Sequence, residues 1–185
     1  MKSLELETAF KYPFNRARAM WNILWIFVPI VGWFALFGYS VRIVQEFCQG
    51  KFKQLPKFKF GSDLKLGFFM FLKALPFAIA YGVVISIVTF VTGDALSALV
   101  NIFLAVFALP ILAVNFLKKE TVESFFEFKI IKFVFDNLGD YLFVILKSIA
   151  LGIVFALMAI ILVGIPAGTF TKNIFLADFY RRRVK

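Results

Sequence analysis

The chain contains no histidine, a single cysteine and only 11 acidic residues, and these shortages exclude several classes of protein. Without histidine there is no histidine base, no catalytic triad of the usual kind and no histidine-ligated metal. With Cys48 alone, no disulfide forms within the chain and a cysteine-based zinc site is out of reach. No phosphate-binding or dinucleotide-binding glycine motif is present. We therefore expect a protein that is not an enzyme and that holds no metal and no other cofactor.

Apolar residues dominate the composition instead. Of the 185 residues 62% are hydrophobic and 27 are phenylalanine, and the mean hydropathy is +0.89. A soluble domain is about half apolar, so we expect lipid to be the solvent for much of this chain. The formal net charge is +10, and the basic residues flank the apolar runs. That pattern is typical of cytoplasmic membrane flanks that attract anionic headgroups, and we expect no nucleic-acid partner.

The polar break Val91-Thr92-Gly93-Asp94 separates two long apolar runs and carries no lysine or arginine. The runs at 66–91 and 95–117 are each long enough to cross the hydrocarbon core, which takes about 20 residues. A turn this short predicts an antiparallel transmembrane hairpin. Small residues share one face of each run and predict close helix packing or contact with a second subunit. On the first run these residues are Ala74, Ala78, Gly82, Ser86, Thr89 and Gly93, and on the second they include Ala98, Asn101, Ala105 and Ala108.

Proline and glycine interrupt the first and last hydrophobic segments, 19–41 and 141–180, near the middle of each. Proline removes a helix donor, and glycine permits backbone conformations that other residues avoid. Each break is therefore either a kink in a crossing helix or the turn of a re-entrant hairpin. The candidate hairpin turns are Pro29, Gly32, Gly164, Pro166 and Gly168.

The remaining segments are polar or basic: an interfacial segment at 1–18, a basic aromatic connector at 42–65, an interfacial segment at 118–140 and a basic tail at 181–185. Ser3 is expected to cap a short helix in the first of these, and Ser62 to cap the helix after the connector. In the connector, lysine and phenylalanine alternate, which would turn the rings toward lipid and the ammonium groups toward phosphate. The charge pattern of 118–140 predicts a break near Phe128.

The distribution of basic residues favours one of the two topologies. If all four apolar runs cross, one side of the membrane carries ten basic residues of the flanking segments, and the other carries nine when Lys172, near the end of the last run, is counted with the tail. If the first and last runs re-enter instead, all nineteen lie on one side and none on the other. We therefore predict that both termini are cytoplasmic. A re-entrant turn leaves backbone polar groups at membrane depth, so we also expect a homo-oligomer that seals the hairpins.

Two sets of polar side chains are candidate functional residues. Lys73 and Lys147 lie inside apolar runs and are expected to extend to the headgroups. With them, the candidate contacts for lipid headgroups are Lys51, Lys53, Lys57, Lys59, Arg181, Arg182 and Arg183. The second set either joins helices by hydrogen bonds or lines a polar path, and it comprises Asn101, Asn115, Ser86 and Thr89.

The sequence thus predicts an all-α integral membrane domain in the cell membrane, multi-pass and bound to anionic headgroups. A central transmembrane helical hairpin is flanked by two Pro/Gly-broken re-entrant hairpins and by interfacial amphipathic helices. Two functions fit this arrangement. The first is a small homo-oligomeric channel or transporter, because broken helices expose polar backbone in the membrane. The second is a membrane-shaping or scaffold protein that wedges the cytoplasmic leaflet and binds anionic lipid.

Short motifs in the first half also resemble a known family. The order Tyr12-Pro13-Phe14, Gly38-Tyr39, Arg42, Leu55-Pro56 and Gly67 resembles a family of archaeal and bacterial membrane proteins, the domain of unknown function 4013. Members tend to have an acidic residue after Leu-Pro, where this chain has Lys57. The resemblance implies a polytopic membrane protein and implies no activity or site.

Overall fold

Helices, joined by turns and one longer connector, make up the chain in the computed structural model, which describes residues 3–184. The interfacial segment at 1–18 and the basic tail at 181–185 therefore each extend slightly beyond the described residues. In chain order the elements are α1 (Leu6–Lys11), η1 (Phe14–Phe27), α2 (Val31–Cys48), α3 (Phe60–Phe107), α4 (Leu109–Lys119), η2 (Val122–Phe125), η3 (Phe128–Ile130), α5 (Ile131–Asp136), α6 (Leu138–Met158), η4 (Ala159–Ile161), α7 (Gly164–Thr171) and α8 (Ile174–Arg183).

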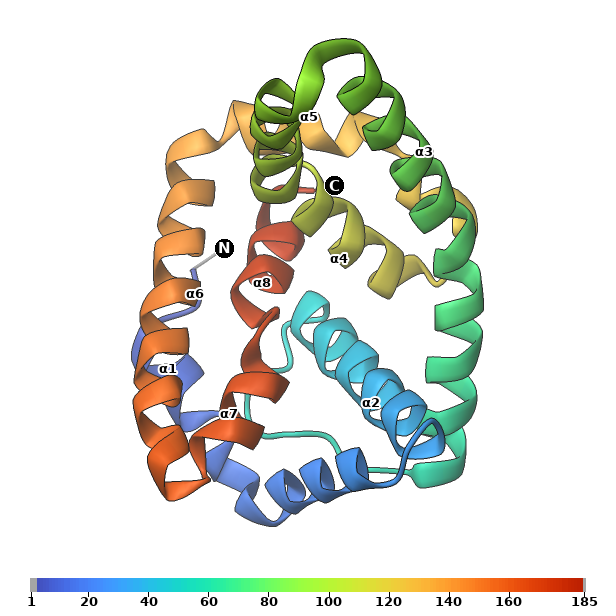
Figure 1. Cartoon of the computed structure of the whole chain (residues 1–185). Coiled ribbons are helices and arrows are strands. Elements are labelled where there is room, and N and C mark those ends of the chain that lie inside the picture. The colour runs from blue at the N-terminus through green and yellow to red at the C-terminus, as the bar shows by residue number, and fades with distance from the viewer. Residues whose placement is uncertain (1–2, 185) are drawn as a thin grey trace.

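Three times along the chain an outer limb reverses direction and returns as an inner limb (Figure 1). In the first hairpin η1 returns as α2, and in the third α6 returns as α7 and α8. In the second, the part of α3 before Gly93 returns as the rest of α3 and α4. The reversals lie at three separate corners of the view in Figure 1, and the inner limbs run from them toward the middle. The sequence predicts the three turns, but not that each hairpin pairs an exposed outer limb with a buried inner limb.

Each reversal contains a residue with positive φ, namely Ile30 at 62°, Gly93 at 79° and Leu162 at 63°. Glycine adopts this conformation readily, but a β-branched residue such as isoleucine rarely does. The first and third reversals also bring backbone close to backbone. A Cβ on Gly32 would lie 1.9 Å from the Trp25 carbonyl oxygen, and one on Gly164 would lie 1.9 Å from that of Phe155. These two glycines therefore permit turns that alanine would obstruct.

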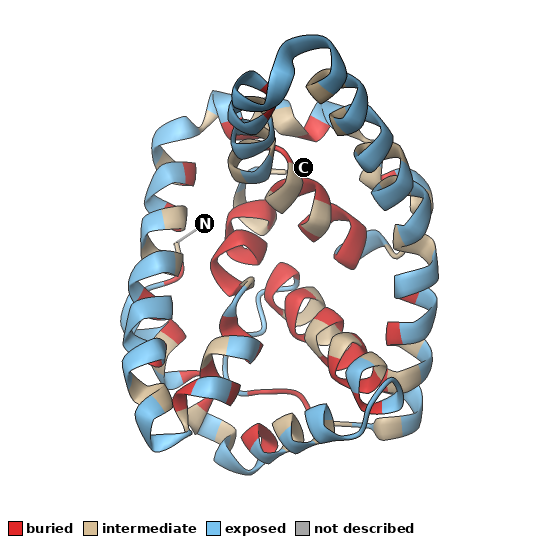
Figure 2. Cartoon of the chain, in the orientation of Figure 1, coloured by how far each residue is buried: buried red, intermediate tan, exposed pale blue. Residues whose placement is uncertain are grey.

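The buried core consists mainly of the inner limbs α2, α4 and α8, which contact one another in the middle of the molecule (Figure 2). Large aromatic side chains fill it, among them Tyr39, Phe116 and Phe179. The Tyr39 ring lies 5.1 Å from the Phe170 ring of α7, so the first and third hairpins meet directly. Burial of such rings is the main source of stability in this region.

The outer limbs are exposed and apolar over long stretches. Two helical segments, Phe60–Phe107 and Leu138–Ile161, are long and apolar enough to cross a membrane. No residue in the most apolar part of α3 is buried by the rest of the chain, and beyond Met70 only Ser97 of that helix is buried. The chain itself thus leaves most of α3 uncovered.

The structure corrects several expectations about local structure. The stretch expected as one helix at 95–117 is divided at Ala108, because the inner limb bends as it enters the core at α4. Ser3 and Ser62 are not caps, since α1 begins after Glu5 and α3 begins after Lys59. Within the chain Gly82 has no packed neighbour, because a Cβ there would find no atom within 4 Å, so contact with a second subunit is the alternative that stays open for it.

Candidate functional site

Two ion pairs fasten the starts of outer limbs to the inner limbs. Asp63, in the first turn of α3, is fully buried, and its Oδ1 lies 2.5 Å from Nε of Arg42 in α2. Asp140, in the first turn of α6, lies 2.6 Å from Nη1 of Arg182 in α8. Both acids also sit at helix N-termini, where the helix dipole favours negative charge. Arg42 and Arg182 of the inner limbs are thereby held beside the starts of the outer limbs.

The Asp178 carboxylate, in α8, accepts three hydrogen bonds. Its Oδ2 accepts the Leu4 amide at 2.9 Å and Nε of Arg182 at 2.9 Å, and its Oδ1 accepts Nη2 of Arg181 at 2.7 Å. The carboxylate is 1% exposed, so these bonds replace the water that it would otherwise bind. Leu4, near the start of the described chain, is thus tied to the last helix.

Asn115 in α4 joins α4, α8 and the segment that follows α4. Its amide donates to the Ser124 carbonyl oxygen at 2.7 Å and to Oε2 of Glu127 at 3.1 Å, and its Oδ1 accepts the Tyr180 hydroxyl at 2.5 Å. Lys119, whose ammonium lies 2.5 Å from Glu127, holds the pKa of that carboxyl below its ordinary value. Asn115 therefore makes an interhelical contact inside the core.

The other candidate polar residues lie elsewhere. Thr89 shares a 2.5 Å hydrogen bond with Ser97 across the second hairpin, and Asn101 accepts the Tyr81 hydroxyl across the same hairpin. Ser86 is exposed on the outside of α3. None of these three is hydrogen-bonded to Asn115 within the described chain: Thr89 and Asn101 bond across the second hairpin, whereas Asn115 bonds within the core.

The candidate turn residues are distributed around two reversals. Pro29 lies between η1 and α2, and Gly32 is the second residue of α2. Gly164, Pro166 and Gly168 all lie within α7, just after the third reversal. Proline is tolerated at such positions because the first helical amides have no partner within the helix.

The connector lysines and phenylalanines alternate as expected, but the rings do not face outward. Phe52 lies 5.0 Å from the Phe47 ring, and Phe58 lies 5.4 Å from the Tyr39 ring, so both cover the core. The lysines between them are exposed: Lys51, Lys53, Lys57 and Lys59. Phe52 and Phe58 thus stabilise the fold, and only the connector lysines are exposed to other molecules.

The other basic candidates are engaged within the chain. The Lys73 ammonium donates to the Glu120 carbonyl oxygen at 2.7 Å, and that of Lys147 donates to the Leu4 carbonyl oxygen at 2.8 Å. Among the tail residues, the Arg181 guanidinium lies over the Phe52 ring at 5.0 Å, the Arg182 side chain is only 5% exposed, and Arg183 pairs with Asp140 at 2.8 Å.

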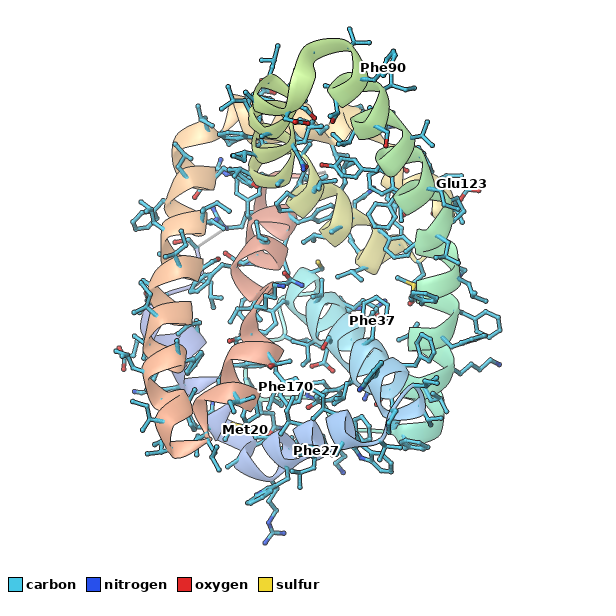
Figure 3. All side chains as sticks on the ribbon, viewed as in Figure 1. Met20, Phe27, Phe37, Phe90, Glu123 and Phe170 are labelled. Atoms are coloured by element: carbon cyan, nitrogen blue, oxygen red, sulfur yellow. The ribbon has the colours of Figure 1, made fainter. Side chains whose placement is uncertain are left out.

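The three reversals carry the most exposed large apolar side chains of the described chain. Phe90 is 92% exposed, Ile160 85% and Phe27 79%. Figure 3 shows Phe27 and Phe90 at the periphery, and Phe37 and Phe170 inside the outline. No lysine or arginine occurs within ten residues of any of these three side chains except Arg18, nine residues before Phe27. The reversals are therefore apolar tips, and the basic residues lie away from them.

The sequence pattern did not predict the two ion pairs or the hydrogen bonds of Asp178. A usable signal was present, because each acid at the start of an outer limb follows a glycine closely, in Gly61-Ser62-Asp63 and Gly139-Asp140. Each acid meets an arginine of an inner limb, Arg42 within α2 and Arg182 in the last turn of α8. Among residues 3–184, no group of three or more histidine, cysteine or acidic side chains is placed to hold a metal ion.

Comparison with known proteins gives one match. A family model described as a protein of unknown function, DUF4013, matches residues 22–164, which spans the three reversals and most of the outer limbs. Neither the curated proteins nor the solved structures contain a match to the chain.

Proposed function

The chain belongs to the DUF4013 family of proteins of unknown function, and from that premise we propose that it is a membrane-embedded scaffold. Its three hairpins enter the bilayer from the cytoplasmic face, wedge that leaflet, and bind anionic lipid through the basic residues at their bases. The single observation that carries the proposal is the set of three apolar tips at Phe27, Phe90 and Ile160. Side chains this large and this exposed are stable in lipid and costly in water.

The positions of the charged residues support one direction of entry. The exposed lysines of the connector lie beyond the ends of the inner limbs, whereas the three tips lack cations. Cytoplasmic flanks of membrane segments are enriched in lysine and arginine, and each such residue near an anionic surface contributes about 1 kcal/mol of attraction. All the basic flanks would then lie on the cytoplasmic side, with the tips directed into the membrane.

The second hairpin has the length to cross. From residue 71, where α3 leaves the core, to Gly93 a helix rises about 34 Å at 1.5 Å per residue. The hydrocarbon core is about 30 Å thick, so Asp94 would reach the far surface. In the first hairpin the reversal follows an outer limb of 14 residues, which favours a re-entrant turn within the membrane.

Side-chain placement favours a scaffold over a channel. A permeation path needs polar groups that line it, and the four candidates Asn101, Asn115, Ser86 and Thr89 are dispersed between the core and the second hairpin. The exposed surface of the outer limbs is instead broad and apolar. Lipid and further copies of the same chain are the partners that such a surface fits.

Single-cysteine labelling in oriented vesicles tests the direction of entry. On a Cys48→Ser background, Ser3→Cys and Val184→Cys should react with an impermeant maleimide only from the cytoplasmic side, and Thr92→Cys only from the outside. If both termini label on the same side as Thr92→Cys, every apolar run crosses and the proposal is wrong.

Vesicle assays test the scaffold itself. The purified protein should change the size distribution of anionic liposomes, measured by electron microscopy, without releasing an encapsulated dye. Dye release at the same protein-to-lipid ratio, with no change in vesicle size, would indicate a channel instead.

A further inference from the structure

An apolar groove of about 540 Å³ lies between α4, α6 and the junction of α7 with α8. Sites for small molecules have volumes of roughly 300–1,000 Å³. Its walls are mostly aliphatic and aromatic, with Leu109 from α4, Ile149 from α6 and Phe175 from α8 among them. No acidic side chain lines it, and Lys172 is its one charged lining residue. The groove therefore suits a long apolar group with negative charge at one end.

Lys172 differs from the two other lysines that lie within apolar runs. Lys73 and Lys147 each donate to a backbone carbonyl oxygen, at 2.7 Å and 2.8 Å. Lys172 is exposed at the edge of the groove and makes no hydrogen bond or ion pair with the described residues. A charge within a membrane segment is costly unless it is paired, and such a residue points to a binding function. The Lys172 ammonium is thus free to bind an anion at the edge of the groove.

The remaining polar lining groups are mostly occupied. The hydroxyls of Ser148 and Thr171 donate to the Val144 and Ala167 carbonyl oxygens one turn earlier. The Asn173 side chain, next to Lys172, makes no hydrogen bond within the described chain. An ammonium and an amide are therefore both available to an anion at this end of the groove.

We propose that the groove binds one acyl chain of an anionic glycerophospholipid, whose phosphate is held by Lys172. The inference rests on the proposed function, because it places the groove in lipid. Anionic rather than zwitterionic lipid is expected, since no carboxylate lines the groove to receive a choline or ethanolamine group. Gly152 in the wall keeps the groove open, because a Cβ there would meet no atom within 4 Å.

Native mass spectrometry of the full chain in detergent tests this inference. Phosphatidylglycerol and phosphatidylcholine with identical acyl chains are added at equal concentration, and the retained lipid is counted. The wild type should retain phosphatidylglycerol preferentially. Lys172→Gln should reduce that preference by about fivefold or more, the factor that corresponds to about 1 kcal/mol per cation at an anionic lipid. Gly152→Leu should reduce retention of both lipids, because leucine fills the groove.

Two control variants make the result specific. Lys129→Gln removes an exposed lysine outside both the groove and the candidate headgroup contacts, and Ala156→Leu enlarges an exposed residue of α6 that does not line the groove. Both should retain lipid like the wild type, and Lys172→Arg should restore the preference. Circular dichroism confirms that each variant is folded.

Three outcomes would overturn the groove site. They are an unchanged preference in Lys172→Gln, unchanged retention in Gly152→Leu, or an equal loss in Lys129→Gln and Lys172→Gln. The last would assign lipid binding to the diffuse basic surface, which leaves the proposed scaffold intact. Failure of the topology experiment is a separate result, because lipid retention in detergent does not depend on orientation.

Discussion

Among single residues, Asp63 has the environment in which a change costs most. Its carboxylate is 0% exposed, pairs with Arg42 and accepts the Lys59 amide at 2.7 Å. Removing one partner of a buried ion pair costs about 3–5 kcal/mol, because the other charge is left without compensation. We predict that Asp63→Asn lowers the unfolding free energy by about 3 kcal/mol, since Asn can keep one hydrogen bond.

The measurement is the midpoint of thermal unfolding in detergent, where about 3 kcal/mol corresponds to roughly 6–12 °C for a chain of this size. Glu7→Gln is the matched control. It breaks the pair of Glu7 with Lys11, whose side chains are 72% and 62% exposed, and should change the midpoint by less than about 2 °C. Equal shifts of the unfolding midpoint in the two variants would show that the ion pair between Asp63 and Arg42 does not stabilise the core.

Because Cys48 is buried, its reactivity and its effect on stability should depend on pH. Burial raises the pKa of the Cys48 thiol to about 11, so almost no thiolate is present at neutral pH. Maleimide should label it more than about tenfold more slowly than Val184→Cys on the Cys48→Ser background at pH 7.5, and its rate should rise toward pH 11. Between the ordinary value of 9.0 and about 11 the thiol ionises only in the unfolded chain, so this group lowers stability as pH rises. Equal labelling rates at pH 7.5 would contradict the burial.

Among the elements, α2 and α3 cross with their backbones in close contact at two glycines. A Cβ on Gly38 would lie 1.9 Å from the Asp63 carbonyl oxygen, and one on Gly67 would lie 1.9 Å from that of Phe34. Backbone atoms cannot move aside as a side chain can, so Gly38→Ala should separate the two helices. We predict a loss of about 3 kcal/mol, at the upper end of overpacking costs, measured by thermal unfolding.

The control is Gly61→Ala in α3, where the added Cβ meets nothing within 4 Å. Alanine is the better helix former by about 1 kcal/mol, so this variant should unfold at the same or a higher temperature. If Gly38→Ala also left the midpoint unchanged, the two backbones would not be in contact.

Local features of this fold could be predicted from the sequence, whereas contacts between elements far apart in the chain could not. The break at Gly93 and the interruptions near Pro29 and Gly164 could be predicted, because turn residues act on their own neighbours. The partners of Arg42 and of Asn115 could not, since they depend on which elements meet in space. Phe52 and Phe58 were assigned to lipid because an alternating pattern shows two faces but not which face is covered.

In the whole molecule, the threefold arrangement explains how such an apolar chain acquires a core. Three inner limbs bury one another, and three outer limbs are left with their apolar surfaces uncovered. The backbone of the first reversal is also partly satisfied locally, because the Val31 amide donates to the Pro29 carbonyl oxygen at 2.7 Å and the Gly32 amide to that of Val28 at 3.0 Å. Sealing this turn therefore requires less help from a second subunit than its position in a membrane suggests.

The uncovered outer limbs supply a different reason to expect a homo-oligomer. Ala78, Gly82 and Ser86 lie one turn apart on α3 and are all exposed, and small residues let helices approach closely in lipid. We predict a detergent-corrected mass by light scattering of at least twice the 21.1 kDa of one chain. Gly82→Leu should return the mass to that of one chain, because leucine holds the facing helix away. Gly61→Leu, an equal enlargement at another open glycine, should leave the mass unchanged. A wild type that is strictly monomeric would show that lipid alone covers α3, and the scaffold would then act as single chains.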